Sequence, residues 1–354
     1  MPTALMWGRF DPGYSRNRMV RKLFEKLGWR VEAFRPFSSR TGRAEALFRG
    51  PGRPDLVWVP CFRQRDIPSA ASRAGKWGVP LVIDPLISAF EKEVFEKKKH
   101  APGSPGARRL LEWEKGLFSA ADLTVADTPA HADFFCENFE LDPDRTAVFH
   151  VGAEQDMFRP MPPPPPGPPF EILFYGSFIH LQGADVIVEA ARKSRDMGLE
   201  ARWVLLGDGD LKEETEKKAA GLDHVRFEPW IDYHALPGRI AKAHILLGIF
   251  GTTPKAGFVI PNKVFQAMAS GRPVITRRSD AYTGAIQESD LIGWTEAGDP
   301  GSLAARVKKW LSDPDGLKSR GEATARLFRD FFSEKRLEKT LSNIVDRAME
   351  RVRE

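Results

Sequence analysis

The segment Phe258–Thr276, with the sequence FVIPNKVFQAMASGRPVIT, places a lysine where a helix should begin. Pro261–Gly271 fits the start of one short helix, whose first turn holds Asn262 and Lys263. The helix dipole disfavours a cation at this end, and the free N–H groups there bind anions. Lys263 is therefore predicted to face a ligand whose negative charge outweighs the positive helix end. The alternative is a solvent-facing lysine whose stem covers Phe265 or a neighbouring residue.

Two further turns in the second half of the chain carry glycines suited to the same anion. In FYGSFIHLQGADVIVEAA, Gly176 ends an expected strand and Gly183 precedes an expected helix. In VLLGDGDLKEE, the residues Gly207, Asp208 and Gly209 stand between a strand and a helix. Glycine lets the backbone approach a ligand closely, and a helix N-terminus attracts phosphate. One such turn is ordinary turn chemistry, but three at the strand ends of one domain predict a phosphate site.

These turns belong to a pattern of short apolar runs that alternate with amphipathic segments. Strands are expected at 3–6, 30–34, 55–59, 80–84, 123–127, 146–151, 171–176, 202–207, 225–230, 245–250 and 273–277. Helices are expected at 16–27, 67–77, 108–118, 130–138, 184–195, 211–220, 234–243 and 263–270. Alternation in both halves predicts an α/β protein with two Rossmann-like, doubly wound parallel sheets. Ligands bind such sheets at the carboxyl ends of the strands, so the cleft between the halves is the expected site.

A proline-rich segment, FRPMPPPPPGPPFEILFYG, marks the expected boundary between the halves. Residues 161–169 are interpreted as a stiff polyproline II linker between domains at 1–160 and 170–330. Residues 331–354 are predicted to form one amphipathic helix, which either packs back on the first domain or caps the second. Its apolar face would hold Leu337, Leu341, Ile344, Val345 and Met349.

Composition indicates a cytoplasmic globular protein. The 354 residues are 42% hydrophobic and 29% charged, and no apolar run is long enough to predict a membrane span. The segment MPTALMWGRF is too short and interrupted for a signal peptide. Cys61 and Cys136 lack metal-ligand spacing and are interpreted as two buried, reduced thiols. The seven histidines show no ligand spacing either, so no metal is expected.

Positive charge is concentrated near the N-terminus. Residues 1–90 hold 16 Lys and Arg against 7 Asp and Glu. Nucleic acid, an anionic membrane surface or an acidic substrate would explain this excess, as would an arginine-rich, solvated surface. No nucleic-acid-binding motif accompanies the charge, so nucleic acid is not an expected partner. The excess predicts peripheral contact with the inner face of an anionic membrane or an acidic substrate, and a solvated arginine-rich surface stays open as the alternative.

The motifs YGSF…LQG, LLGDGD and PNKVFQAMASGRPVI, together with the earlier HVGAEQDMFRP, resemble those of family 4 glycosyltransferases of GT-B fold. They occur in the family's order, and GLFSAADLTVADTPAHADFF is also similar to a family segment. The resemblance implies an enzyme that moves a hexosyl or related sugar from a nucleotide-diphosphate sugar to a glycan, lipid-linked or small-molecule acceptor. It implies retention at the anomeric carbon and no required metal or cofactor. It also implies that the second domain binds the donor and the first binds the acceptor.

The resemblance implies donor-binding roles for the three turns and their flanking segments. The residues are Gly176, Ser177, Gln182, Gly183, Gly207, Asp208, Gly209, Trp230, Phe258, Asn262, Lys263 and Gln266. The chain departs from the family, because Ser177 and Gln182 replace a usual basic pair, and Phe258 and Gln266 replace two usual glutamates. Lys263 is then the remaining cation for the diphosphate, with Gln266 placed towards the ribose. These losses leave open a catalytically inactive homologue that binds a nucleotide or a partner.

In the first half, WGRFDPGYSRNRMVRKLFEKLG follows the first strand and resembles the acceptor-side loop of the family. Acceptor-binding roles are thereby implied for Gly13, Tyr14, Arg16 and Arg18, although simple surface arginines fit as well. Asp84 ends PLVIDPL, where the family often carries a polar residue, commonly His. A catalytic role beside Lys263 is implied for Asp84, and the alternative is a helix N-cap. A nicotinamide oxidoreductase is disfavoured, because no GxGxxG follows the first strand.

Overall fold

The computed structural model describes residues 1–165 and 167–352, which form two compact units. The first unit holds Met1–Val151 and the C-terminal stretch from Glu334, and the second holds Gly152–Ser333. The division therefore lies before the expected boundary at residue 160. The proline-rich segment belongs to the second unit, where Arg272 donates hydrogen bonds to the carbonyl oxygens of Met161 and Pro162.

The first unit is built on a six-stranded parallel sheet in the order β2-β1-β3-β4-β5-β6. Its strands are β1 (Thr3–Trp7), β2 (Arg30–Phe34), β3 (Leu56–Val59), β4 (Leu81–Ile83), β5 (Leu123–Ala126) and β6 (Thr146–Val148). Its helices are α1 (Ser15–Lys26), α2 (Gly42–Arg49), α3 (Ile67–Trp77), α4 (Pro105–Phe118), α5 (Pro129–Phe139) and α13 (Glu334–Arg351). A π-helical turn spans Glu91–Glu96, and 3₁₀ turns span Gln64–Asp66 and Pro143–Arg145.

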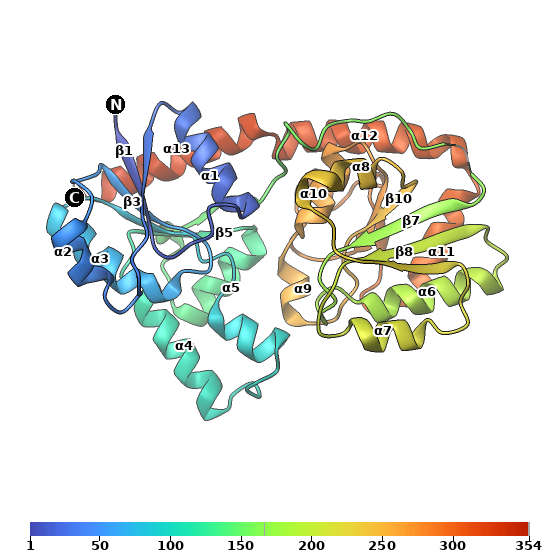
Figure 1. The fold of residues 1–354 in the computed structure, drawn as a ribbon, viewed down its shortest axis with the longest axis horizontal. Coiled ribbons are helices and arrows are strands. Elements are labelled where there is room, and N and C mark those ends of the chain that lie inside the picture. The colour runs from blue at the N-terminus through green and yellow to red at the C-terminus, as the bar shows by residue number, and fades with distance from the viewer. Residues whose placement is uncertain (166, 353–354) are drawn as a thin grey trace. The chain divides into compact units, whose positions relative to one another are not determined.

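Both faces of this sheet are buried, as continuous apolar strands require. Leu5, Trp7 and Val57 pack on the face covered by α3, α4 and α5. Ala4, Leu56 and Trp58 pack on the opposite face with α1 and α13 (Figure 1). The apolar face of α13, with Leu337, Leu341, Ile344, Val345 and Ala348, lies in this second cluster. Of the two placements left open for the C-terminal helix, the structure therefore shows the first, packing on the first unit.

The second unit has another six-stranded parallel sheet, in the order β12-β11-β10-β7-β8-β9. Its strands are β7 (Phe170–Tyr175), β8 (Ala201–Leu206), β9 (Val225–Glu228), β10 (Ile245–Leu247), β11 (Val274–Arg277) and β12 (Gly293–Thr295). Its helices are α6 (Ala184–Asp196), α7 (Lys212–Lys218), α8 (Leu236–Ile240), α9 (Pro254–Phe258), α10 (Asn262–Ala269), α11 (Pro300–Leu311) and α12 (Pro314–Phe332). 3₁₀ turns span Tyr233–Ala235 and Gly284–Ile286.

The predicted α/β class with two parallel sheets is confirmed. The predicted C-terminal helix is present as Glu334–Arg351, but its predicted start at residue 331 is wrong, because α12 ends at Phe332 and Ser333 is extended before α13 begins. The end of the prediction, residues 353–354, lies outside the described residues. The short strand β12 and the helices α2, α9, α11 and α12 were not predicted. No helix in the described part of the chain is long and apolar enough to cross a membrane.

Candidate active site

The two glycine turns that follow β7 and β8 contact each other through their backbones. Gly176 has φ 147° and Gly207 has φ 138°, which side-chain-bearing residues rarely adopt. A Cβ added to Gly207 would lie 2.0 Å from the carbonyl oxygen of Gly176, and one added to Gly209 would lie 2.6 Å from the amide nitrogen of Phe178. Because β7 and β8 are neighbours in the sheet, the predicted first and second turns form one surface at its carboxyl edge.

Gly183 packs the first glycine turn against the loop that follows β10, the other neighbour of β7 in the sheet. It is the N-cap of α6, with φ 68°, and a Cβ there would lie 2.6 Å from the amide nitrogen of Gly251. The amide nitrogen of Phe250, just after β10, donates a hydrogen bond to the carbonyl oxygen of Gln182. The loops that follow three neighbouring strands are thus packed without room for larger residues at these positions.

Lys263 points inward from the first turn of α10 and closes on the first glycine turn. Only 5% of the residue is exposed, and Nζ donates a hydrogen bond to Oε1 of Gln182. The same Nζ lies 3.8 Å from the centroid of the Phe174 ring, and a Cβ on Gly176 would lie 2.8 Å from it. The alternative of a solvent-facing lysine is therefore wrong. The structure brings Lys263, Gln182 and Gly176 together, and their contacts with a donor remain predictions.

The charge of Lys263 is poorly compensated. Burial holds the pKa of its ammonium group well below the usual range. Within the described residues no carboxylate lies within 4 Å of Nζ, and its partners are a neutral amide and the face of an aromatic ring. A buried cation without an anionic partner is costly, so an arriving anion would restore the missing interaction.

Gln266, predicted to lie towards the ribose, is held in a chain of buried and partly buried hydrogen bonds. The Tyr175 hydroxyl donates to Oε1 of Gln266 over 3.0 Å, and Nε2 of Gln266 donates to the Tyr233 hydroxyl over 3.3 Å. The Tyr233 hydroxyl in turn donates to Oε2 of Glu154 over 2.9 Å. The sequence reasoning named Gln266 but missed the two tyrosines and Glu154. Glu154 lies within the quoted HVGAEQDMFRP, whereas nothing in the local pattern singles out Tyr233.

The remaining predicted donor residues surround the same turns. Trp230 is 61% exposed, and one edge of its ring lies 3.2 Å from where a Cβ of Gly207 would stand. Such a half-exposed aromatic surface suits stacking against a nucleobase. Oδ1 of Asp208 accepts a hydrogen bond from the amide nitrogen of Gly209 at 2.8 Å. Ser177 is exposed, Asn262 is half-buried, and Phe258 packs against a small apolar cluster with Leu181.

In the first unit, Asp84 and Arg16 are paired with each other inside the core. Both are 1% exposed, and Arg16 donates to the two carboxylate oxygens of Asp84 at 2.8 and 3.0 Å. Arg16 also donates to the carbonyl oxygen of Phe149 at 2.8 Å. Burial alone would lower the pKa of Arg16, but the Asp84 carboxylate reverses the shift and raises it. A contact of either residue with a substrate would require this pair to open.

The alternative that Asp84 caps a helix is wrong, because no helix begins at this residue. The other predicted acceptor residues lie at the start of α1. The amide nitrogen of Gly13 donates to Oδ1 of Asp11 at 2.8 Å, and the Arg18 guanidinium donates to the carbonyl oxygen of Gly13. Tyr14 is the N-cap of α1, and its ring meets Phe62 edge-on. Their acceptor contacts remain predictions.

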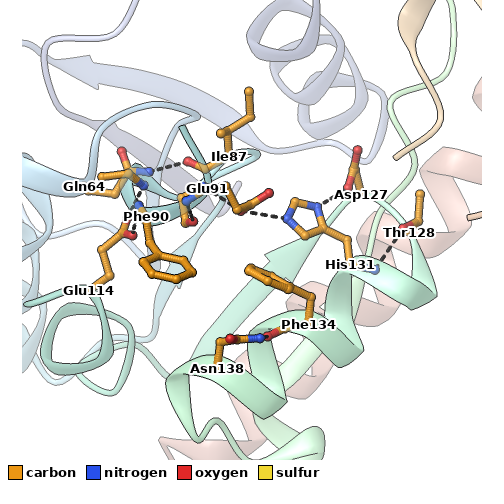
Figure 2. A network of polar contacts seen from close by, with 12 residues as sticks. Gln64, Ile87, Phe90, Glu91, Glu114, Asp127, Thr128, His131, Phe134 and Asn138 are labelled. Atoms are coloured by element: carbon orange, nitrogen blue, oxygen red, sulfur yellow. Dashed lines mark hydrogen bonds and ion pairs between the residues drawn. The ribbon is translucent and has the colours of Figure 1, made fainter. Parts of the chain in front are cut away.

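A second buried charge network, which the sequence reasoning missed, lies beyond β4 and β5. Figure 2 shows the His131 ring between two carboxylates, with Asp127 on one side and Glu91 on the other. Nδ1 lies 2.5 Å from Oδ1 of Asp127, and Nε2 lies 3.1 Å from Oε2 of Glu91. Burial would lower the pKa of His131, but the two carboxylates outweigh it and raise the pKa to about 9. The network joins α5 to the π-helical turn at Glu91.

Nearby Glu114 of α4 accepts hydrogen bonds from the amide nitrogens of Ala89 and Phe90, and burial raises its pKa to about 7. Both cysteines carry free thiols; Cys61 is buried, whereas Cys136 is only half-buried, so the expectation of two buried thiols is half right. The described residues contain no group of three or more His, Cys, Asp or Glu side chains placed to hold a metal ion.

Comparison with known families matches both halves of the chain. The family model described as "Glycosyl transferase 4-like domain" matches residues 13–152, and that described as "Glycosyl transferases group 1" matches residues 169–313. Among curated proteins, the D-inositol 3-phosphate glycosyltransferase of Streptomyces coelicolor is 26% identical over 313 residues, covering 79% of this chain and 66% of that protein. The protein of the same name from Acidothermus cellulolyticus is 28% identical, covering 80% of this chain and 64% of that protein. The chain thus spans less than two thirds of the length of either relative.

Solved structures match over nearly the full chain. HepE of Anabaena in complex with UDP-glucose has a TM-score of 0.71 at 14% identity, covering 98% of this chain and 100% of that chain. Sucrose-phosphate synthase of Thermosynechococcus elongatus has a TM-score of 0.73 at 15% identity, covering 99% and 100%. At this identity the likeness concerns the fold, which is GT-B. Together with the two family matches, it shows that the chain belongs to the family 4 glycosyltransferases of GT-B fold.

Proposed function

We propose that this protein is a glycosyltransferase that moves a sugar from a nucleotide-diphosphate sugar to an acceptor, with retention at the anomeric carbon. The observation that carries the proposal is the buried Lys263 of α10, whose ammonium group lies against the first glycine turn without a carboxylate partner in the described residues. Its position and charge suit the diphosphate of a donor. Family membership and the complex of the structural neighbour HepE with UDP-glucose support the same ligand class.

The chemistry follows from where charge develops. When the sugar leaves, negative charge grows on the phosphate oxygens while the anomeric carbon becomes positive. A cation and N–H groups fixed in advance at that place stabilise the transition state more than the ground state. Lys263 supplies the cation, and the glycine turns supply close backbone approach. In a retaining reaction of this kind the departing phosphate helps to accept the proton of the acceptor hydroxyl, so no protein carboxylate pair is needed.

The other polar groups near Lys263 are proposed to orient the donor. Gln266 lies in the middle of α10, one turn after Lys263, and its hydrogen bonds to Tyr175 and Tyr233 fix the direction of its amide. Trp230 covers the nucleobase, and Asn262 assists Lys263 at the phosphate. We propose that no metal ion takes part, because Lys263 delivers the positive charge that a metal would otherwise bring to the diphosphate.

We also propose that the first unit contacts an anionic membrane surface from the cytoplasmic side. The excess of basic residues before residue 90 supplies the electrostatic attraction. Phe37, Leu47 and Phe48 add exposed apolar side chains in and beside α2, with Phe48 91% exposed. Apolar side chains beside a basic surface are typical of peripheral binding to a lipid interface.

A second candidate function is nucleotide binding without transfer. It is favoured by the departures at Ser177, Gln182 and Phe258, which remove two cations and one carboxylate that the family usually carries. The donor pocket would then bind a nucleotide, but added acceptor would not speed its release from a nucleotide sugar.

The experiment for the donor site is a thermal-stability screen with UDP, GDP, ADP and CMP, each with and without EDTA. We expect at least one nucleoside diphosphate to raise the melting temperature equally with and without the chelator, because ligand bound only to the folded state stabilises it. If none of the diphosphates shifts the transition, the donor site is wrongly assigned. If EDTA removes the shift, the metal-free part of the proposal fails.

A further inference from the structure

A polar cavity lies within the first unit, apart from the donor site of the second unit. Its volume is about 910 Å³, within the size range of sites for small ligands. It opens among the segments that follow β1, β2 and β3, at the carboxyl edge of the sheet. Four arginines line it, together with serines and with Leu110 and Trp113 of α4; the arginines are Arg9, Arg40, Arg43 and Arg65.

The four arginines are not balanced by acidic side chains. No ion pair forms to any of them within residues 1–165 and 167–352, and no acidic residue is among those that line the cavity. The nearby Asp66 is buried, and its Oδ2 accepts from Nε of Arg63 at 2.7 Å and from the amide nitrogen of Arg9 at 3.1 Å. The negative charge of Asp66 is therefore neutralised by Arg63 and does not balance the arginines that line the cavity.

Two helices begin at the same place and add to the positive potential. The first turn of α3 supplies Pro68 and Ser69 to the lining, and the first turn of α2 supplies Arg43. The two helices contact each other in the first unit (Figure 1). Neither has a side-chain hydrogen bond at its N-cap, so both present the positive ends of their dipoles. Glu45 of α2 turns instead to the preceding loop, where it accepts from the amide nitrogen of Phe37 at 2.9 Å.

We propose that this arginine-lined cavity binds the phosphate group of a phosphorylated saccharide or polyol. The paired N–H donors of an arginine guanidinium match the geometry of phosphate oxygens. Several guanidinium groups around one cavity suit a doubly charged phosphate ligand better than a ligand with a single carboxylate. The exposed ring of Trp113 forms an apolar wall beside the arginines, against which the carbon face of a sugar ring can lie. That this ligand is the acceptor rests on the proposed function, whereas the binding itself does not.

The test is binding of glucose 6-phosphate, with glucose as the uncharged reference, measured by calorimetry at low salt. We expect wild type to prefer the phosphorylated sugar at least tenfold. The double variant Arg40→Ala/Arg43→Ala should lose at least tenfold in that affinity, and Arg43→Lys should lose part of it because the fork is lost. Arg35→Ala is the matched control, because Arg35 is exposed, lies outside the lining and forms no ion pair with any residue that the structure describes. It should change the affinity less than twofold.

All of these arginines are exposed, so the variants should fold, and thermal melting checks this. Equal affinity of the double variant and wild type for glucose 6-phosphate, or equal binding of glucose and glucose 6-phosphate, overturns the proposal. A parallel arm replaces the soluble sugar with phosphatidylglycerol vesicles, with phosphatidylcholine vesicles as reference. If the double variant loses more affinity for phosphatidylglycerol vesicles than for glucose 6-phosphate, the bound phosphate belongs to a lipid headgroup. If it loses more affinity for glucose 6-phosphate, the phosphate belongs to a soluble acceptor.

The proposal and the proposed function fail separately. Release of nucleotide from a sugar donor is measured on the same protein samples. Arginine-dependent binding of glucose 6-phosphate by a protein that never turns over a donor refutes the transferase and leaves the anion site standing. Donor turnover together with arginine-independent binding refutes the anion site alone.

Discussion

Replacing Lys263 by methionine removes the charge of a buried side chain while keeping most of its volume. The ammonium group has no carboxylate partner in the described structure, and burial already lowers its pKa well below the usual range. Methionine has no charge to desolvate and fills similar space above the Phe174 ring. We therefore expect the melting temperature of the ligand-free Lys263→Met protein to equal or exceed that of wild type.

The affinity for a nucleoside diphosphate should fall at the same time. A hydrogen bond to a charged group contributes about 1.5–3 kcal/mol, which corresponds to roughly a 10- to 150-fold weaker complex. Calorimetry with UDP, GDP and ADP measures this difference. Lys242→Met is the matched control, because Lys242 is exposed in the same unit and forms no ion pair among the described residues, and it should leave the affinity unchanged.

Lys263 also makes binding depend on protons. A diphosphate beside Nζ raises the lowered pKa of the lysine, so the complex takes up a proton at pH values between the free and bound pKa. The affinity should fall as the pH rises through the pKa of the free protein. Titrations in two buffers of different ionisation enthalpy reveal this uptake, and Lys263→Met should abolish it. Equal affinity of Lys263→Met and wild type at all pH values would refute the reasoning.

Three other predictions concern the first unit. Asp84→Asn should destabilise the protein by about 3–5 kcal/mol, because it leaves the buried Arg16 guanidinium without its carboxylate; a denaturant midpoint equal to that of wild type would contradict this. The pKa of His131 is raised from 6.5 to about 9, so its protonation should contribute roughly 3 kcal/mol of stability. This contribution is fully present below pH 6.5 and is lost as the pH rises through 9. His131→Gln should flatten this part of the pH–stability profile, and an unchanged profile counts against the network. Binding to anionic vesicles should weaken with salt and exceed binding to neutral vesicles, and equal partitioning onto both at low salt would exclude the membrane contact.

Local pattern was sufficient to predict the parts of the structure that depend on neighbouring residues. The apolar runs and glycine turns placed the strands that form the two parallel sheets, and the lysine at the start of α10 indicated an inward-facing charge. The three residues of β12 were missed because Gly293–Thr295 is too short to show an alternation. The helices α2, α9, α11 and α12 received no assignment.

Contacts between remote segments could not be predicted in the same way. Arg16 and Asp84 were each assigned to the site, yet their pairing across 68 positions makes them partners inside the core. The hydrogen bond from Tyr233 to Glu154 spans 79 positions, and nothing near either residue marks it. The arginine cavity gathers side chains that follow three different strands, so its charge was visible in the composition but its location was not.

The most direct test of the central claim is the release of nucleoside diphosphate from nucleotide sugars. The assay supplies UDP-, GDP- and ADP-sugars, with and without an acceptor mixture that includes phosphorylated sugars. The account predicts release from at least one donor, accelerated by acceptor, unaffected by EDTA and strongly reduced in Lys263→Met. A protein that binds a nucleoside diphosphate through Lys263 but releases none from any donor, whatever acceptor is added, would contradict it.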